Sequence, residues 1–373
     1  MAWTKQQEGA LRAIEAWRKM PRNTRPQVFR LFGFAGTGKT TLAKEVAKME
    51  RGKVLYATFT GKAALVLQGN GCEDCSTLHS LIYQFEVDQV TGEAIFSLNP
   101  SSELYDASLL VIDEVSMVDE FLGSDVLSFG TDILVIGDPA QLPPIKGAGF
   151  FIDANPDIML TDIHRQAQDN PIIRMSMDVR EGRRLQFGSY GESAVIDRRK
   201  VDRDELRHHV LEADQVLCGL NRTRISYNRR IRELKGLITH DEWMPSIGDQ
   251  LICLRNNREK FIFNGGMWSV IDFAQTDGGS VEVRIVSHDQ KRDPLDVHIA
   301  REFFEGKEAT MDWRVRREFD EFTFGWAITG HKSQGSQWGN VLIFDESAAF
   351  REFRNNHLYT TITRASERVK VIL

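Results

Sequence analysis

The sequence predicts an α/β protein with more than one domain, and three observations support this prediction. Short apolar runs rich in strand formers alternate with stretches whose apolar residues repeat at helical spacing. A glycine-rich loop joins one such strand to one such helix at residues 33–40. The alternation starts again after about residue 150, and 373 residues are too many for one ordinary hydrophobic core.

Composition narrows the class of protein. Apolar residues make up 42% and charged residues 27% of the chain, as in a soluble globular protein. No run approaches the ~18 consecutive apolar residues of a membrane helix, and the first residues lack the apolar core of a signal peptide. We therefore expect a protein without a membrane partner that lies in the cytoplasm, or in the cytoplasm of an infected host cell if a phage encodes it.

The formal net charge of −6 indicates that a nucleic-acid contact would need a local basic channel. Basic residues cluster at 222–235 and 314–317, although solvated helix faces are the commoner explanation of such clusters. Cys72 and Cys75 form a C-x-x-C near His79, but no second pair at matching spacing completes a zinc site. We expect these thiols to be reduced.

The glycine-rich loop reads Gly-Phe-Ala-Gly-Thr-Gly-Lys-Thr and matches the pattern G-x-x-x-x-G-K-[ST]. Its glycines let successive backbone N–H groups turn towards phosphates, and the helix N-terminus adds partial positive charge. We expect Lys39 to reach the β- and γ-phosphates of ATP and Thr40 to bind Mg²⁺. A glycine turn that binds nothing is the alternative, which the complete motif and its flanks disfavour. The expected nucleotide contacts are Gly36, Thr37, Gly38, Lys39, Thr40 and Thr41.

An amphipathic helix is expected over residues 3–20, with Thr4 as its N-cap. Gln7 has two interpretations. It completes a capping box with Thr4, or its amide presents the donor and acceptor that match an adenine edge. Spacing alone favours capping at least as much as adenine recognition.

Two further predicted strands end in polar residues that would meet the phosphate loop. The apolar run at 109–112 ends in Asp113 and Glu114, where an Asp can hold Mg²⁺ and an adjacent Glu can polarise the attacking water. A plain strand exit is the alternative, and the glycine loop about 70 residues earlier disfavours it. After the next apolar run, at 133–137, Asp138 and Gln141 would project towards the same sheet edge.

Two stretches depart from the alternation. Residues 84–102 contain two alternating segments around a glycine turn, which indicates a β-hairpin inserted in the first α/β domain. Residues 246–321 contain short strands with turns between them, which indicates a small β-barrel inserted in the second. Strands at 158–161 and 215–220 are assigned to the second domain, which resumes at Phe322.

Seven segments occur in an order and spacing that are specific to one family: GFAGTGKTT, TFTGKAA, VIDEVSMVD, VIGDPAQLPPI, DIHRQ, AITGHKSQGSQW and YTTITRA. With these segments the chain resembles the superfamily 1 DNA helicases of the RecD/Dda type over nearly its whole length. The resemblance implies two RecA-like P-loop NTPase domains that bind ATP between them and DNA across their tops. It divides the chain into a first RecA-like domain (1–83 and 103–152) with the hairpin insertion (84–102), and a second (153–245 and 322–373) with an SH3-like barrel insertion (246–321).

Three features depart from the family pattern. Phe59 stands where Pro is usual, and Gln337 stands where Glu is usual, so a sugar contact there would use a neutral amide. We also expect a minimal motor, without the accessory domain that precedes it in many RecD proteins.

The resemblance also implies roles for single residues. Glu114 would be the catalytic base, and Asp113 would bind Mg²⁺ together with Thr40. Gln141 would sense the γ-phosphate, and Gln7 would recognise adenine. The implied catalytic set, in which the two arginines are fingers from the second domain, is Lys39, Glu114, Gln141, Arg165 and Arg364.

DNA contacts are implied in two loops, which would line the single-strand path, and in the hairpin. The hairpin at 84–102 occupies the place of the family's strand-separating pin, where Phe85 or Phe96 would stack on the junction base. Packing of these phenylalanines in a core is an equally good explanation. The implied DNA contacts are Thr60, Lys62, Phe85, Phe96, Thr329, His331, Lys332 and Ser333.

The features together predict an ATP-dependent DNA helicase that moves 5′ to 3′ on single-stranded DNA, as a monomer, in replication, recombination or repair. Its partners would be single-stranded DNA, single-strand/double-strand junctions, and a single-strand-binding or other replication protein. Two other classes stay open. An ATP-switched DNA-remodelling or clamp-loading protein would share the nucleotide motifs but need no pin, and a small-molecule phosphotransferase would need no second domain carrying Arg364. RNA in place of DNA also stays open.

Overall fold

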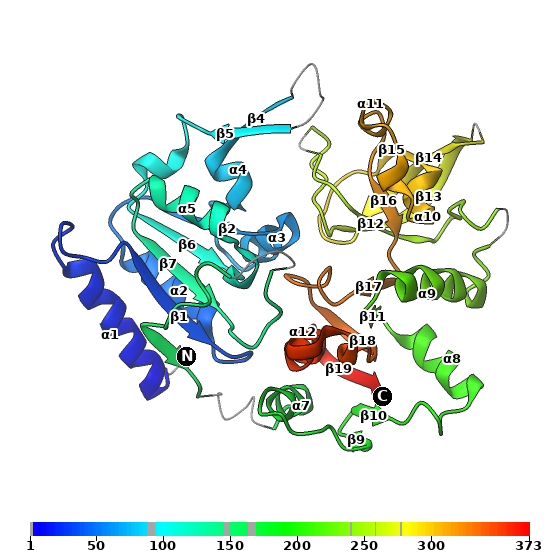
Figure 1. Cartoon of the computed structure of the whole chain (residues 1–373), viewed down its shortest axis with the longest axis horizontal. Coiled ribbons are helices and arrows are strands. Elements are labelled where there is room, and N and C mark those ends of the chain that lie inside the picture. The colour runs from blue at the N-terminus through cyan, green and yellow to red at the C-terminus, as the bar shows by residue number, and fades with distance from the viewer. Residues whose placement is uncertain are drawn as a thin grey trace. The chain divides into compact units, whose positions relative to one another are not determined.

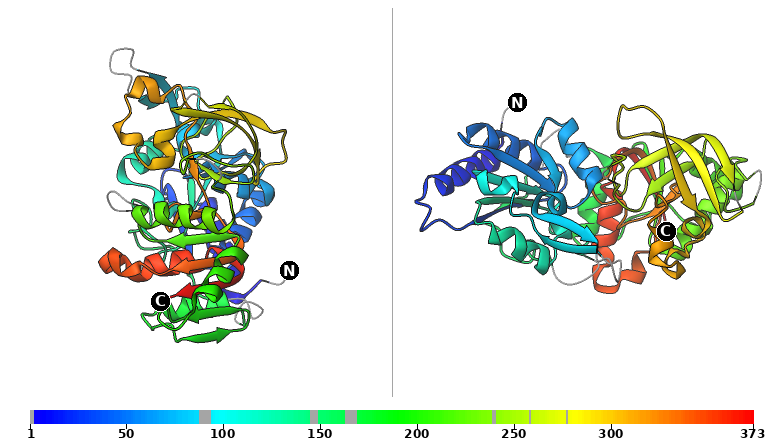
Figure 2. Two further views of the ribbon diagram at one scale, coloured as in Figure 1. Left: turned by 90° about the vertical axis from the view of Figure 1, so that its right-hand side faces the viewer. Right: turned by 90° about the horizontal axis from the view of Figure 1, so that it is seen from above.

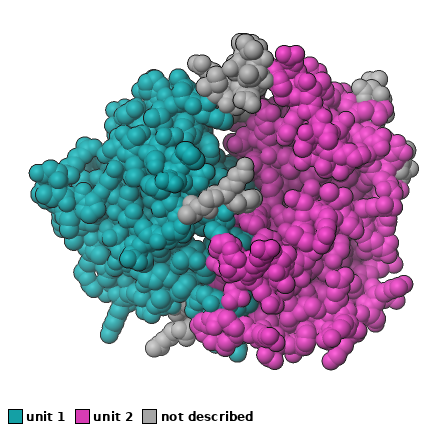
Figure 3. Space-filling view, in the orientation of Figure 1, with its two compact units in different colours: residues 1–180 teal, residues 181–373 magenta. Residues whose placement is uncertain are grey.

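The computed structural model describes residues 3–87, 94–144, 149–162, 169–238, 241–257, 259–276 and 278–373. The chain forms two compact units, residues 1–180 and 181–373, which Figure 3 colours separately. Each unit contains a six-stranded sheet, and unit 2 adds a five-stranded antiparallel sheet (Figure 1). Among the described residues, no helix combines the length and the apolar character that crossing a membrane requires.

Unit 1 is built on a parallel sheet with the strand order β3-β2-β6-β7-β1-β8. Its strands are short apolar runs, as expected for parallel strands that are buried on both faces. They are β1 (Val28–Gly33), β2 (Val54–Thr58), β3 (Cys75–Thr77), β6 (Leu109–Asp113), β7 (Ile133–Gly137) and β8 (Ile158–Leu160). The helices are α1 (Lys5–Lys19), α2 (Lys39–Met49), α3 (Gly61–Gly69), α4 (Leu78–Ile82), α5 (Glu120–Ser128) and α7 (Pro171–Arg180), with 3-10 turns η1 (Glu103–Asp106) and η2 (Val115–Met117).

The side chains of each strand divide between two hydrophobic cores. Leu31 of β1 packs on one face of the sheet with Trp17 of α1 and Leu42 of α2. Phe32, the next residue, packs on the other face with Leu122 of α5. Helices therefore cover both faces of the sheet, and the strand ends remain as the edge where side chains can gather.

The start of α1 confirms the predicted capping box. The Thr4 hydroxyl accepts a hydrogen bond from the Gln7 backbone N–H, and the Gln7 Oε1 accepts one from the Thr4 N–H at 3.0 Å. The helix then buries one apolar stripe, as the spacing of its apolar residues predicts.

Two strand pairings in unit 1 lie near the domain boundaries predicted from the sequence. β8 pairs in parallel with β1, so this strand belongs to the first sheet, whereas the sequence analysis assigns it to a domain that begins at 153. The apolar run at 158–160 suits a strand of either domain, so its residues alone do not show which sheet it joins. The pairing with β1 decides this. In the region predicted as a hairpin, β4 (Tyr83–Val87) and β5 (Ala94–Leu98) pair antiparallel as a separate two-stranded sheet.

The first sheet of unit 2 has the order β17-β11-β18-β19-β10-β9, and β9 is its antiparallel edge strand. Its strands are β9 (Gly188–Tyr190), β10 (Ser193–Ile196), β11 (Gln215–Cys218), β17 (Ala327–Thr329), β18 (Trp338–Phe344) and β19 (Ala365–Ile372). Its helices are α8 (Arg203–Glu212), α9 (Asn221–Leu234) and α12 (Arg354–Ile362), with the 3-10 turn η4 (Ser347–Phe353) before α12. The sequence pattern predicts no strand at β9 or β10, which are short and lie among polar residues.

The antiparallel sheet of unit 2 has the order β15-β14-β13-β12-β16. It contains β12 (Gln250–Cys253), β13 (Met267–Thr276), β14 (Ser280–Ser287), β15 (Leu295–Ala300) and β16 (Phe322–Phe324), with α10 (Arg301–Glu305), η3 (Glu308–Thr310) and α11 (Trp313–Arg316) between the last two strands. Register shifts between β13 and β14 accompany the bending of these strands, which are yellow to orange in Figure 2. β16 pairs with β12, so Phe322 continues this sheet, although the sequence analysis assigns it to the resumed α/β domain.

A fully buried ion pair joins the elements of unit 2. Arg232 of α9 and Asp249, which precedes β12, are 1% and 0% exposed, and the Arg232 Nε lies 3.0 Å from both Asp249 oxygens. Asp249 also accepts hydrogen bonds from the Ser246 N–H and the Trp326 indole N–H. A single carboxylate therefore connects a helix, the antiparallel sheet and the segment that leads into β17.

Substitution Asp249→Ala should lower the free energy of unfolding by about 3–5 kcal/mol, because the Arg232 charge would stay buried without its partner. Urea unfolding followed by circular dichroism would measure this loss. The matched control is Asp296→Ala, which removes the exposed Arg284–Asp296 pair and should cost less than about 1 kcal/mol. Equal losses in the two variants would contradict the central role of the buried pair.

A buried histidine lies behind the loop that follows β17. His357 of α12 is 0% exposed, stacks on Phe350 with ring centroids 4.1 Å apart, and has no hydrogen-bond partner for either ring nitrogen among the described residues. A Cβ atom at Gly330 would lie 2.8 Å from its Nε2, so only glycine fits there. Burial, with a smaller contribution from the nearby His331, lowers the pKa of His357 to about 4.

Because the His357 pKa is lower in the folded than in the unfolded chain, unfolding takes up a proton below pH ~6.5. Protonation of His357 should therefore not affect the free energy of unfolding above pH ~6.5 and should lower it by up to about 3 kcal/mol as the pH falls towards 4. Urea unfolding at several pH values would show a smaller decline for His357→Leu than for the parent chain. The matched control is His208→Leu, at an exposed histidine. Its free energy of unfolding should decline with falling pH as it does in the parent chain.

Candidate functional site

The phosphate loop of unit 1 requires glycine at three positions. Gly36 and Gly38 have φ of 78° and 79°, in the left-handed region that other residues rarely adopt. At Gly33 a Cβ atom would lie 2.7 Å from the Thr37 Oγ1 and 2.8 Å from the Leu160 Cβ, so β8 closes the space behind the loop. The glycines of the motif thus allow the turn from β1 into α2.

Lys39, the first residue of α2, lies folded back across this loop. Its Nζ donates hydrogen bonds to the carbonyl oxygens of Gly33 at 2.8 Å and Phe34 at 3.0 Å. Both acceptors are neutral, so phosphate oxygens would be stronger partners for the ammonium group. The predicted phosphate-binding lysine is therefore held at the centre of the loop.

The end of β6 meets the start of α2 through side chains. The Thr40 hydroxyl donates to the Asp113 Oδ2 at 3.0 Å, and the Glu114 N–H donates to the Asp113 Oδ1 at 2.8 Å. Burial, followed by the neighbouring Glu114 carboxylate, raises the pKa of Asp113. A carboxylate and a hydroxyl at this spacing form the hard oxygen set that Mg²⁺ prefers, so these residues fit the predicted metal.

Glu114, the predicted catalytic base, has an unusual backbone. Its φ of 53° and ψ of 43° lie in the left-handed region, which costs a non-glycine residue free energy. Such strain is commonly retained at functional sites. The conformation turns the chain sharply after β6, immediately beyond Asp113.

Gln7 is 1% exposed and connects α1 to the phosphate loop. Besides its part in the capping box, its Nε2 donates to the Thr37 carbonyl at 2.9 Å. Its neighbour Gln6, which the sequence analysis did not identify, accepts the Thr161 and Asp162 N–H groups at 2.8 Å each. The two adjacent amides thus hold the phosphate loop and the residues that follow β8. No sequence pattern predicts the contact that Gln6 makes.

Phe34 of the phosphate loop contacts Arg180, and no sequence pattern predicts this contact. The guanidinium of Arg180, at the end of α7, lies 3.6 Å from the centroid of the Phe34 ring. This distance indicates a cation–π interaction. The two residues are far apart in sequence, so only the folded chain brings them together.

The remaining predicted residues of unit 1 lie around this centre. Gln141 follows β7 and is 9% exposed, and Thr41 is exposed on the first turn of α2. Thr60 is the N-cap of α3, and Lys62 in its first turn is 5% exposed. Phe96 is 55% exposed and lies 5.8 Å from the Tyr83 ring, measured between centroids. Arg165 and the side chain of Phe85 lie outside what the structure describes.

In unit 2 the predicted DNA loop follows β17. Lys332 donates from its Nζ to the Asn264 Oδ1 at 2.7 Å, and burial lowers the pKa of this lysine. Ser333 is 0% exposed and its hydroxyl donates to the Gly330 carbonyl, so this side chain shapes the loop from within. His331 is half-buried against Phe350, and Thr329 ends the strand.

Arg364 follows α12 and is 6% exposed. Its Nε donates to the Thr360 carbonyl at 3.1 Å, and its Nη1 donates to the Ser336 carbonyl at 3.3 Å. These bonds join α12 to the end of the predicted DNA loop. Arg364 and Lys332 therefore belong to one connected region of unit 2.

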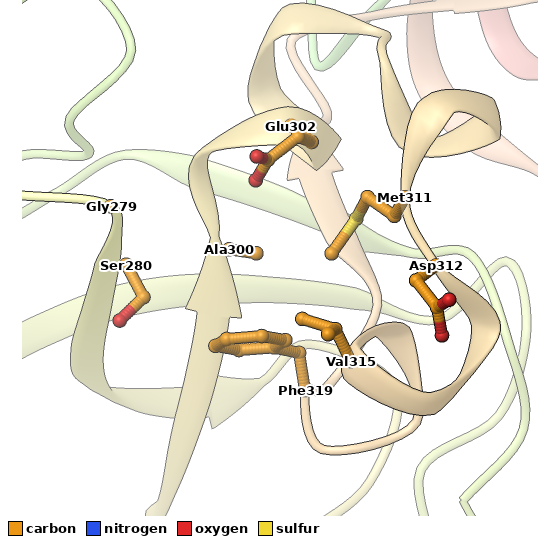
Figure 4. A pocket seen from close by; sticks show the side chains of 8 residues that line it. All are labelled: Gly279, Ser280, Ala300, Glu302, Met311, Asp312, Val315 and Phe319. Carbon is orange, nitrogen blue, oxygen red and sulfur yellow. The ribbon is translucent and has the colours of Figure 1, made fainter.

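A cavity of about 410 Å³ lies elsewhere in unit 2, beside the antiparallel sheet. Met311, Val315 and Phe319 provide its apolar side chains, with Glu302 and Asp312 at its margin (Figure 4). It contains none of the predicted site residues.

The cysteines of the C-x-x-C segment are buried. Burial raises the pKa of Cys75 to about 12, which favours an unreactive thiol. In the part of the chain that the structure describes, no group of three or more His, Cys, Asp or Glu side chains is arranged to hold a metal ion.

Comparison with known families matches an AAA domain over residues 7–200 and a UvrD-like helicase C-terminal domain over residues 324–372. The RecD2 ATP-dependent DNA helicase of Deinococcus radiodurans is 28% identical over 364 residues, covering 91% of this chain and 46% of that protein. The ATP-dependent DNA helicase Pif1 of a Psychrobacter species is 24% identical over 397 residues, covering 82% of this chain and 60% of that protein. The chain thus spans about half the length of these curated relatives.

Solved structures share the fold. Pif1 helicase from Bacteroides, in complex with ADP-AlF3 and single-stranded DNA, matches with a TM-score of 0.59 at 19% identity and covers 99% of this chain and 92% of that one. Because the AAA domain model alone matches more than half of the residues, the chain belongs to that family. The chain is also similar to RecD2 and Pif1 helicases.

Proposed function

We propose that the protein is an ATP-dependent DNA helicase that moves 5′ to 3′ on single-stranded DNA. The observation that carries the proposal is the cluster at the carboxyl edge of the unit 1 sheet, where Lys39, Thr40, Asp113 and Glu114 supply what ATP hydrolysis requires. The named activity of the RecD2 and Pif1 relatives supports the step from ATP hydrolysis to DNA unwinding.

In the proposed reaction, Lys39 exchanges its two carbonyl partners for oxygens of the β- and γ-phosphates. Thr40 and Asp113 would hold Mg²⁺, whose charge neutralises part of the triphosphate. Glu114 orients the attacking water and accepts its proton. Gln141, on the loop after β7, would respond to the γ-phosphate and transmit its presence to the DNA contacts.

Two arginines complete the proposed hydrolysis step. Arg165 and Arg364 would neutralise the charge that grows on the transferring phosphoryl group. Two of the hydrogen bonds of the Arg364 guanidinium go to the carbonyl oxygens of Thr360 and Ser336, and a charged phosphate would be a stronger acceptor than either. ATP binding would close the two RecA-like domains, hydrolysis would open them, and each cycle would advance the strand.

The single strand is proposed to follow the loop at 329–333 and the start of α3, where Thr60 and Lys62 lie. The antiparallel sheet of unit 2, which β16 extends to Phe324, would act as an SH3-like barrel that braces the DNA. The segment 84–102 would act as the pin, with the exposed Phe96 as the residue that meets the junction base. Single-stranded DNA and single-strand/double-strand junctions are the proposed substrates.

Lys39→Ala should reduce ATP turnover by about 10²–10³-fold, because it removes the cation that stabilises the β- and γ-phosphates. A coupled ATPase assay with saturating oligo-dT would measure the loss, and anisotropy of a labelled oligonucleotide should show unchanged strand binding. Lys48→Ala, an exposed lysine of the same helix, is the matched control and should behave like the parent chain. Full turnover by Lys39→Ala would refute the assigned site.

Duplexes with a 5′ or a 3′ single-stranded overhang test the proposed motor and its direction. Single-stranded DNA should stimulate ATP hydrolysis, and only the duplex with the 5′ overhang should be unwound, as measured by release of a quenched fluorescent strand. Unwinding from the 3′ overhang alone would reverse the proposed polarity. Stimulated hydrolysis without unwinding from either end would instead support an ATP-switched remodelling protein.

A further inference from the structure

A turn in the antiparallel part of unit 2 holds one aromatic side chain towards solvent. Phe261 is 65% exposed, and its φ of 50° lies in the left-handed region. A bulky non-glycine residue rarely adopts this conformation unless its surroundings impose it. The ring makes no aromatic or cation contact with another described residue, so neither the core nor the turn uses it.

The backbone of this turn is fixed on both sides of Phe261. Asn257 and Ile262 exchange two backbone hydrogen bonds, at 2.8 and 2.9 Å, and the Ile262 side chain is buried in the core. The Lys260 N–H donates to the Asn257 Oδ1, and the Arg292 Nη1 donates to the Lys260 and Phe261 carbonyls at 2.8 and 3.1 Å. These contacts hold the strained backbone and therefore fix the point from which the Phe261 side chain projects.

The turn is connected to the predicted DNA loop within the same unit. The Asn264 Oδ1 accepts a hydrogen bond from the Lys332 ammonium at 2.7 Å. The Asn264 backbone N–H donates one to the Asn256 Oδ1, also at 2.7 Å. The side chains of Lys332 and Arg292 donate hydrogen bonds to neutral oxygens. The carboxylate that acts electrostatically on Lys332 is Glu321, which is itself paired with Arg255 and Arg316. By contrast, Lys260 is paired with Asp320. An exposed aromatic ring thus lies in a region that offers two cations to a phosphate backbone.

We propose that Phe261 is a stacking platform for a base of the single strand that crosses the loop at 329–333. A base offers a π-face to an aromatic ring whatever its identity, and backbone phosphates offer acceptors to neighbouring cations. Phe261 would stack on the base while Lys332 and Arg292 contact the adjacent phosphates. This inference rests on the proposed single-strand function and adds a residue that the sequence motifs do not include.

The strain at Phe261 supplies variants that separate binding from folding. Phe261→Gly removes the ring and suits the left-handed backbone, so it should fold at least as stably as the parent chain. Phe261→Leu keeps an apolar side chain without a π-face, and Phe261→Trp keeps the π-face. Phe121→Ala is the matched control, because Phe121 is 85% exposed on α5 of unit 1.

The test measures binding of fluorescein-labelled oligo-dT to the full chain by anisotropy, without nucleotide. Phe261→Gly and Phe261→Leu should bind about 5- to 150-fold more weakly, the range for one lost base stack. Phe261→Trp and Phe121→Ala should bind like the parent chain. An oligonucleotide with abasic sites has no bases to stack, so the parent chain and Phe261→Gly should bind it equally. Thermal unfolding of each variant would exclude a loss of fold.

Three results would overturn the inference while leaving the proposed function intact. Two of them are unchanged oligo-dT binding by Phe261→Gly and full binding by Phe261→Leu, which would indicate a general apolar contact. An equal loss by Phe261→Gly on the abasic strand would also overturn it, because the ring would then act without a base. If the parent chain bound no oligonucleotide and its ATPase did not respond to DNA, the proposed function itself would fail.

Discussion

The hydrogen bond between Thr40 and Asp113 joins the two elements on which the candidate site of unit 1 is built. It joins two side chains that are 73 residues apart, one at the start of α2 and one at the end of β6. The bond forms only because parallel strands end at a common edge and because the glycine loop turns α2 towards that edge. A Cβ atom at Gly33 would lie 2.8 Å from the Leu160 Cβ, so the close packing of β8 against the loop requires glycine at this position.

Unit 2 depends on a different kind of contact, a network around an ion pair whose two side chains are 1% and 0% exposed. Arg232, Asp249 and Trp326 connect α9, the antiparallel sheet and the strand that carries the proposed DNA loop. Burying charges is costly unless each one is paired and hydrogen-bonded, and here each one is. The network sets the position of β17, and Lys332 can then reach Asn264.

Backbone strain coincides with exposed or reactive chemistry at two of the three described non-glycine residues with positive φ. Glu114 and Phe261 adopt left-handed conformations without the freedom of glycine. Each is held by its neighbours: Glu114 by its bond to the carboxylate of Asp113, and Phe261 by the bonds that Arg292 makes to the turn. Strain of this kind persists only where surrounding contacts outweigh it, and it presents a carboxylate at one site and an aromatic ring at the other.

The sequence by itself determined the local elements: the phosphate loop, the strand that ends in Asp113, and the capping box of α1, because each depends on neighbouring residues whose backbone geometry follows from residue type. It also indicated the family, through motifs whose order is preserved. Only the tertiary structure decided that the strand at 158–160 joins the first sheet and that Phe322 continues the antiparallel one. The same holds for the contacts of Arg180 with the phosphate loop and of Lys332 with Asn264. Their partners are distant in sequence, and an apolar run or a lone cation carries no information about which distant segment will pack against it.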